Sequence, residues 1–337
     1  MNISKAGVFG VAIIGCGLIG QKRANSLGDE GKLLACVDLN NEKSQSLAIE
    51  TNAKSFNCWR EILLLSEIDL VIIATPHDSL AEITMAAIAA GKHVLVEKPA
   101  ARFAEELLPV ISAANKSNIK VHVGFNHRYH RSVQKAKEIV GSGVLGDLMF
   151  IRARYGHGAR VGYEKEWRAD PKLSGGGELI DQGSHLIDLS RWFLGEFSQM
   201  QGFAHTYFWD MPVDDNGFML LKTPKQQAAF LHVSCTEWKN LFSMEIYGKN
   251  GKLDLSGLGG SYGLEKLTYY KMLPQMGPPE TTSWEYPMAD DSWATEMAEF
   301  YDDIRQDREP AAGLNDAYQS LKIIEQIYKD SGYDHCA

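Results

Sequence analysis

The chain has 337 residues, 45% of them hydrophobic, and a formal net charge of −9 at pH 7. This length exceeds the size that one hydrophobic core usually serves, so we expect two domains. The acidic balance, without a dense run of Lys or Arg, argues against nucleic acid or an anionic membrane as a partner.

The cysteines and the first residues of the chain indicate the cellular compartment. The five cysteines never fall as Cys-x-x-Cys, which favours reduced thiols and gives no zinc signature. Residues 1–9 are too short and mixed for a signal peptide, and no apolar run approaches ~18 residues. We therefore expect a cytoplasmic protein that does not cross a membrane.

The first predicted element is an apolar strand at 11–14 that breaks into three glycines before a helical pattern. Gly15 would allow a tight turn, Gly17 would let a pyrophosphate approach the backbone, and Gly20 would let the helix lie close to the strand. The unpaired N–H groups at such a helix start attract phosphate, so Leu18 and Ile19 are also expected at a nucleotide. The alternative is a glycine turn without a ligand.

The second apolar run, 32–37, ends at Asp38. This acid follows the last glycine at close to the ~20-residue separation expected for the group that binds an adenosine ribose. Its carboxylate would repel a 2′-phosphate, and no Arg or Lys lies beside it. The pattern therefore favours NAD over NADP.

Strand and helix patterns then alternate, which is typical of a parallel sheet covered on both faces. The expected helices are 42–51, 59–65, 79–90 and 104–115, and the expected strands are 53–55, 70–74, 93–96 and 120–123. Thr75, Pro76 and His77 follow one strand at the carboxyl edge, where a doubly wound sheet binds its ligand. We expect an NAD-binding Rossmann domain over residues 1–124.

Glu97 and Lys98 follow the strand 93–96 at the same edge. Lys98 is either a solvated surface lysine or a cation beside the nicotinamide, and its position favours the second. Glu97 could pair with or orient the amine. Pro99 fixes the chain direction, and the bond before it is a candidate for the cis form.

The second half alternates apolar and polar residues in strand-length segments. The expected strands are 149–155, 201–208, 218–222, 228–238, 242–247, 252–255 and 267–272, with loops at 257–260 and 274–279 and helices at 293–305 and 315–328. They predict an α+β domain over 125–337 with a large open, mainly antiparallel sheet. Because the exposed face needs a cover, we expect a homodimer or homotetramer.

A glycine-led helix at 175–188 carries Asp181, His185 and Asp188. Residues four apart share a helical face, so a carboxylate can steer the imidazole. Histidine titrates near neutrality, which suits it to take a proton from a hydroxyl as hydride leaves the same carbon. The alternatives are a helix-interior histidine and a zinc ligand, but no cysteine lies nearby to support zinc.

Together these motifs resemble the Gfo/Idh/MocA family over nearly the whole chain. The marks are residues 15–20, 74–76, 90–99, 124–128 and 175–188. The resemblance implies an NAD-dependent oxidoreductase that acts on a secondary or anomeric hydroxyl of a sugar, cyclitol or nucleotide sugar. It assigns Lys98 to the substrate hydroxyl, His185 to acid/base work and Asp181 to positioning.

The resemblance also assigns contacts outside this catalytic set. Asn126, Trp167 and Arg168 would lie near the cofactor, and Arg128 near the substrate. We expect substrate identity to be determined in the loop 157–166, which carries Arg160, Tyr163 and Lys165. Arg160 and Lys165 either hold a phosphate or carboxylate or belong to a solvated loop.

One position departs from the family pattern, since this chain has His77 and Leu80 where members often carry Asn and, three residues later, His. His77 either replaces that nicotinamide-side contact or leaves it altered. Two other functions share this fold: a glycosidase that recycles retained NAD and a non-catalytic sugar-sensing protein. The presence of Lys98, Asp181 and His185 favours the dehydrogenase.

Overall fold

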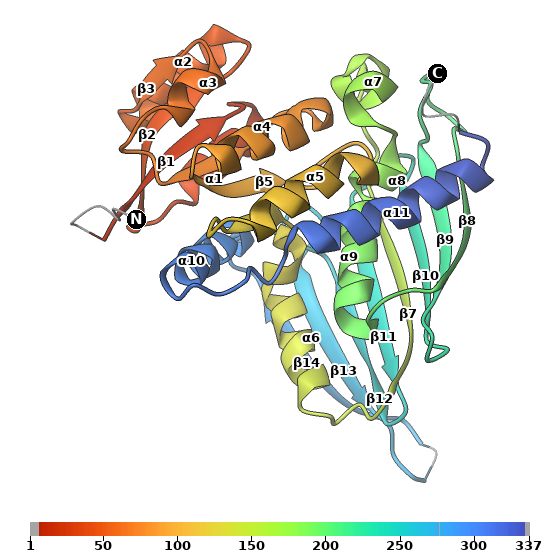
Figure 1. The fold of residues 1–337 in the computed structure, drawn as a ribbon. Helices are drawn as coiled ribbons and strands as arrows, with labels where there is room; N and C mark the ends of the chain where they lie inside the picture. Colours follow the sequence, from red (N-terminus) through yellow and green to blue (C-terminus); the bar gives the residue numbers. More distant parts are fainter. Residues whose placement is uncertain (1–6, 276, 334–337) are drawn as a thin grey trace. The chain divides into compact units, whose positions relative to one another are not determined.

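The computed structural model describes residues 7–275 and 277–333 (Figure 1). The chain divides into two compact units. The first comprises Met1–Phe125 with Trp293–Gln319, and the second comprises Asn126–Ser292 with Ser320–Ala337. The first unit thus takes in a C-terminal segment that the expected division at 124/125 had placed in the second domain.

The first unit is built on a six-stranded sheet in the order β3-β2-β1-β4-β5-β6, and its neighbouring strands all pair in parallel. The strands are β1 (Phe9–Ile14), β2 (Gly31–Val37), β3 (Lys54–Phe56), β4 (Leu70–Ile73), β5 (His93–Glu97) and β6 (Val121–Gly124). The order reverses between β1 and β4, as in the dinucleotide-binding folds. The predicted doubly wound sheet is confirmed.

The helices of this unit follow the expected alternation. They are α1 (Leu18–Asn25), α2 (Asn41–Thr51), α3 (Trp59–Leu63), α4 (His77–Ala89), α5 (Ala104–Asn115) and α10 (Ser292–Arg305). The helix α4 begins two residues earlier than expected, directly after Pro76. The N–H groups in the first turn of a helix have no acceptor within the helix, so a helix can start immediately after a proline, which lacks an N–H.

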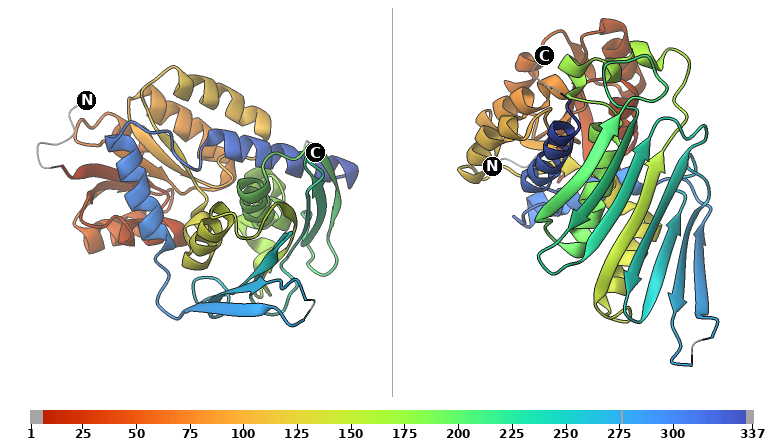
Figure 2. Two further views of the ribbon diagram at one scale, coloured as in Figure 1. Left: turned by 90° about the horizontal axis from the view of Figure 1, so that it is seen from below. Right: turned by 90° about the vertical axis from the view of Figure 1, so that its right-hand side faces the viewer.

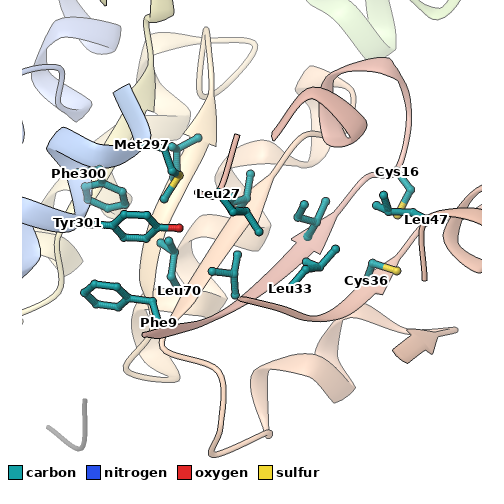
Figure 3. Close-up of a cluster of buried hydrophobic side chains, with 14 of the residues drawn as sticks. Phe9, Cys16, Leu27, Leu33, Cys36, Leu47, Leu70, Met297, Phe300 and Tyr301 are labelled. Carbon is teal, nitrogen blue, oxygen red and sulfur yellow. The ribbon is translucent and has the colours of Figure 1, made fainter. Parts of the chain in front are cut away.

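A single apolar core explains why α10 belongs to the first unit. On the sheet, Val11 and Ile13 of β1 point to the side where α10 packs, and both are fully buried. Figure 3 shows Met297, Phe300 and Tyr301 of α10 lying against this core. The Tyr301 ring stacks on Phe9 with centroids 4.9 Å apart. The period-3.6 pattern of α10 predicted its apolar face, but not which core it covers.

The second unit is built on an eight-stranded sheet in the order β14-β13-β12-β11-β7-β10-β9-β8 (Figure 2). Its strands are β7 (Leu148–Gly156), β8 (Gln199–His205), β9 (Asn216–Lys222), β10 (Ala228–Ser234), β11 (Leu241–Gly248), β12 (Gly251–Ser256), β13 (Glu265–Lys271) and β14 (Glu280–Tyr286). All neighbouring pairs are antiparallel except β7 with β10. The predicted open, mainly antiparallel sheet is confirmed.

Helices contact one face of this sheet (Figures 1 and 2). They are α6 (Arg131–Gly141), α8 (Glu178–Asp181) and α9 (Gly183–Leu194); the short helix α7 (Pro171–Ser174) lies between α6 and α8 in the chain. The final helix, α11 (Leu314–Asp330), is divided between the two units. Neither α6 nor β14 was predicted; most of β14 is exposed, so its sequence lacks a strong apolar alternation.

The opposite face of the sheet exposes large apolar side chains. Phe203, Leu220 and Phe230 lie on the neighbouring strands β8, β9 and β10 and are 49–52% exposed. Leu220 pairs with Phe230 on the neighbouring strand, whereas the next residue, Leu221, is fully buried. Because successive side chains of a strand point to opposite faces, the exposed residues share one face. Among the described residues, no helix is long and apolar enough to cross a membrane.

Candidate active site

The glycine turn after β1 has the geometry that its sequence predicts. Gly15 adopts φ +96°, and a Cβ added there would lie 2.4 Å from the carbonyl oxygen of Ala74. A Cβ on Gly20 would lie 2.0 Å from the carbonyl oxygen of Gly15. A Cβ on Gly17, the residue that precedes α1, would meet nothing within 4 Å. Gly15 and Gly20 are therefore required by the fold, whereas Gly17 borders open space at a helix N-terminus.

Asp38 lies at the carboxyl end of β2, beside this turn. Its Oδ2 accepts a hydrogen bond from the Cys16 N–H at 2.7 Å, and its Oδ1 accepts one from the Asn40 N–H at 2.8 Å. Each carboxylate oxygen retains a second lone pair for a ribose hydroxyl. The turn, the helix start and the oriented acid fit a dinucleotide.

The ends of β4 and β5 bring the other predicted cofactor residues to the same sheet edge. The Thr75 hydroxyl accepts a hydrogen bond from Ser79 at 2.8 Å, and His77 is buried as the first residue of α4. Lys98 follows β5 and is half-buried. The peptide bond from Lys98 to Pro99 is cis, as its sequence suggested.

Glu97 belongs to a buried ionic network that the sequence analysis missed. Its Oε1 accepts from Nε of Arg23 at 2.6 Å, and Nη1 of the same arginine donates to Glu296 at 2.5 Å. Nε2 of His122 lies 3.1 Å from Glu296. Burial raises the pKa of the Glu97 carboxyl, while the charges of Arg23 and Lys98 oppose that rise. Glu97 therefore has Arg23 as a direct ion-pair partner, which the proposed pairing with Lys98 did not include.

The predicted helix over 175–188 is broken. Asp181 ends α8, Gln182 separates the two helices, and His185 lies in the first turn of α9. The His185 N–H donates to the carbonyl of Gln182 at 3.2 Å, a tightened 3₁₀-type bond. Asp181 and His185 are thus not presented by one continuous helix, because the glycine at 183 begins a second one.

Asp181 and Asp188 each pair with an arginine. Asp181 Oδ2 accepts from Nε of Arg168 at 3.0 Å, and the Arg168 guanidinium lies 4.6 Å from the Trp167 ring. Asp188 receives two hydrogen bonds from the buried Arg128, at 2.8 and 2.5 Å. Because Nε and Nη2 of Arg128 both donate to Asp188, this arginine is held in the core of the second unit. Its contact with substrate stays a prediction.

The ring of His185 meets a second imidazole. Its Nδ1 lies 2.6 Å from Nδ1 of His127, and the ring centroids are 3.7 Å apart. His127 belongs to a 3₁₀ helix, η1 (Asn126–Tyr129), in which Asn126 donates to the Ser292 hydroxyl at 3.2 Å. The sequence marks His127 only as part of a motif, and no local pattern indicates its partner 58 residues away.

Glu178 anchors the loop that was expected to recognise substrate. Tyr163 donates its hydroxyl hydrogen to Glu178 at 2.9 Å, and Nε2 of His157 lies 3.3 Å from the same carboxylate oxygen. Burial alone would lower the pKa of His157, but hydrogen bonding and charge from Glu178 raise it overall. Burial and the same carboxylate raise the pKa of Tyr163, so its hydroxyl stays neutral.

The same loop borders an open cavity of about 610 Å³. The cavity is lined by Gly158, Arg160, Val161, Gly162, Glu164, Phe208, Trp209, Asp210 and Trp238. Arg160 is 68% exposed and pairs with Glu166 at 2.6 Å. Within residues 7–275 and 277–333, no group of three or more His, Cys, Asp or Glu is arranged to hold a metal ion.

Comparison with known proteins identifies both halves of the chain. Residues 9–125 match the model described as the oxidoreductase family with an NAD-binding Rossmann fold, and residues 133–254 match the GFO/IDH/MocA C-terminal domain. The two matches together cover well over half of the chain. The chain belongs to the Gfo/Idh/MocA family.

Two relatives of this chain are named as sugar dehydrogenases. Levoglucosan dehydrogenase of Pseudarthrobacter phenanthrenivorans is 35% identical over 49% of this chain and 43% of its own. D-glucoside 3-dehydrogenase of Escherichia coli is 31% identical over 58% and 57% of the two chains. The matches thus span about half the length of these relatives. The chain is an oxidoreductase-family protein with sugar dehydrogenases among its relatives.

Solved structures share the complete fold. A levoglucosan dehydrogenase in complex with NADH and levoglucosan superposes with a TM-score of 0.84 over 96% of this chain and 98% of its own, at 23% identity. GenD2 from gentamicin A biosynthesis, in complex with NAD, gives 0.83 over 96% and 94% at 22% identity. At this identity the likeness establishes the fold alone.

Proposed function

We propose that this protein is an NAD-dependent dehydrogenase of a sugar, cyclitol or nucleotide sugar. The observation that carries the proposal is the dinucleotide cradle, in which an open Gly17 and an oriented Asp38 accompany a lysine at the same sheet edge. The relatives named as levoglucosan and D-glucoside dehydrogenases support a carbohydrate substrate.

Each side chain has a distinct task in this proposal. The Lys98 ammonium holds the substrate hydroxyl and stabilises negative charge that develops on its oxygen. His185 takes the hydroxyl proton, and Asp181 helps to position the imidazole. Bound NAD would accept the hydride from the same carbon. A carboxylate at Asp38 disfavours a 2′-phosphate, which is the basis for preferring NAD to NADP.

Substrate recognition is proposed for the loop 157–166. Its attachment to Glu178 through Tyr163 links it to the start of α8, which ends at Asp181. The aromatic rings of Trp209 and Trp238 in the neighbouring cavity suit the apolar face of a sugar ring. Arg160, on the rim, suits a carboxylate or phosphate on the substrate.

We also propose that the exposed face of the eight-stranded sheet pairs two copies of the chain. Phe203, Leu220 and Phe230 form an apolar patch of the kind that marks an interface. Light scattering coupled to size-exclusion chromatography should give a dimer or tetramer. A monomeric mass at micromolar concentration would reject this assignment.

The activity is tested by following NADH formation at 340 nm with levoglucosan, alkyl glucosides, inositols and nucleotide sugars, and with NADP in place of NAD. We expect Lys98→Ala and His185→Ala to lower turnover on the best substrate by roughly 10²-fold or more. Lys116→Ala, which removes an exposed lysine, is the matched control. Unchanged turnover in both variants would remove the assigned roles.

The double variant tests whether Lys98 and His185 serve one step. If both act on the same hydroxyl, their combined loss should fall well short of the product of the single losses. Independent, multiplicative losses would contradict a shared substrate group. Tightly bound NAD that turns over without net NADH would favour the recycling glycosidase.

A further inference from the structure

Two buried imidazoles in the second unit, His127 and His185, meet through like atoms. They are 6% and 5% exposed, and their Nδ1 atoms are 2.6 Å apart. Two N–H groups cannot face each other at this distance, and two lone pairs would repel. Flipping either ring would bring a carbon into the contact at far less than van der Waals separation. One proton must therefore lie between the two nitrogens, donated by one ring and accepted by the other.

We propose that His127 is the positioning residue that holds His185 in its Nδ1–H tautomer. In that tautomer His185 donates its Nδ1–H to His127, and His185 Nε2 carries the lone pair that accepts the substrate proton. The identification of Nε2 as the base rests on the proposed dehydrogenase function. The shared proton itself rests only on the geometry of the two rings.

The arrangement also accommodates the proton that is taken up during turnover. When Nε2 accepts the hydroxyl proton, His185 becomes an imidazolium and its hydrogen bond to His127 becomes charge-assisted, which strengthens it. The Nδ1 proton can then move to His127, leaving His185 neutral with its new proton on Nε2. The pair gains one proton in either form, and a further one would force two N–H groups together.

The charged and titratable groups around this pair are themselves engaged. The Tyr155 ring lies 5.0 Å from that of His127, and burial together with Tyr262 raises its pKa well above 10, so it stays neutral. His130, 5.5 Å from His127, lies 3.3 Å from Glu265. Close to them in the chain, Arg128 pairs with Asp188, and Asp181 pairs with Arg168. The Nδ1–Nδ1 contact therefore ties the tautomer of His185 to that of His127.

Two substitutions separate positioning from simple packing. Asn places an amide oxygen close to the position of imidazole Nδ1, so His127→Asn can still accept from His185, whereas His127→Phe fills the space without an acceptor. We expect His127→Phe to lower kcat about 10- to 100-fold with little change in KM, and His127→Asn to recover most of that loss. The exposed His205→Asn is the control.

The pH profile gives a second readout. Loss of the acceptor removes stabilisation of the His185 imidazolium, so the acid limb of kcat/KM should move to lower pH in His127→Phe and stay near the parent in His127→Asn. Equal losses in the two variants with an unchanged acid limb would show a merely structural contact and overturn the proposal.

A measurement without turnover distinguishes failure of this inference from failure of the proposed function. In ¹⁵N-histidine-labelled protein, assigned with the His127→Asn and His185→Asn variants, the His185 nitrogens should report a proton on Nδ1 and a lone pair on Nε2. In His127→Phe we expect the Nε2–H form to gain population. A parent protein with His185 protonated on Nε2 alone would refute the tautomer assignment, even if the enzyme proves active.

Discussion

Replacement of Arg23 by methionine is expected to destabilise the first unit severely. The Arg23 side chain is fully buried and holds Glu97 at 2.6 Å and Glu296 at 2.5 Å. Removing one partner of a buried ion pair leaves an uncompensated charge and costs about 3–5 kcal/mol. Arg23→Met leaves two carboxylates without that partner, so the upper part of this range, about 4–5 kcal/mol, applies, with a fall in Tm of about 8–20 °C for a unit of this size.

The exposed pair of Arg60 and Glu82 supplies a matched control. Its N–O distance is also 2.6 Å, but both side chains are 63% exposed. Because solvent screens such a pair, Arg60→Met should change the unfolding free energy by less than about 1 kcal/mol. Urea unfolding followed by circular dichroism compares the two variants with the parent.

The loss of unfolding free energy in Arg23→Met should depend on pH. The positive charge of Arg23 opposes the rise in pKa that burial imposes on Glu97 and helps to lower the pKa of Glu296. Without it, both folded-state pKa values should lie higher than in the parent, so protonation relieves the repulsion. The difference in unfolding free energy between the parent and Arg23→Met should therefore be larger at pH 8 than at pH 5. An Arg23→Met protein within about 1 kcal/mol of the parent at pH 8 would refute this account of the network.

Two further predictions concern the glycine turn and acid stability. Gly17→Ala should keep the stability of the apo protein but weaken NADH binding measured by fluorescence. Gly20→Ala should lower the stability, because its Cβ would lie 2.0 Å from a carbonyl oxygen. Equal melting temperatures of the two variants would contradict this difference. Burial raises the pKa of Glu265, but hydrogen bonds from His130 and the Ser132 N–H outweigh burial and lower it to about 2. Since the folded-state pKa of Glu265 is depressed, its carboxylate stabilises the folded protein by about 3 kcal/mol above pH 4.5, and this stabilisation is lost towards pH 2. Glu265→Gln should therefore be less stable than the parent at pH 7, and the two stabilities should converge in acid.

Local patterns sufficed for the predictions that concern contiguous residues. The strand at β1, the glycines that follow it and Asp38 after β2 lie within one βαβ segment, where the chain itself imposes proximity. The spacing of Gly15 and Gly20 therefore reveals two positions where a side chain would clash with the backbone. Parallel pairing then brings the residues after β4 and β5 to the same edge.

Hydrophobic periodicity predicted apolar faces but not their partners. The helix at 293–305 was expected within the second domain, whereas its Met297, Phe300 and Tyr301 pack on the core of the parallel sheet and the helix groups with the first unit. The single helix expected over Asp181 and His185 was wrong, since spacing alone does not reveal a break at Gln182.

Local patterns in the chain were enough to predict the Rossmann unit, the open sheet and the residues proposed for hydride transfer. The folded arrangement was needed to show that Arg23 pairs with Glu296, 273 residues away, and that the Nδ1 atoms of His127 and His185 lie 2.6 Å apart. The physical reason is that a buried charge or imidazole takes whichever partner the packed elements bring within hydrogen-bonding distance, and residues so far apart in the chain leave no periodic trace of that choice.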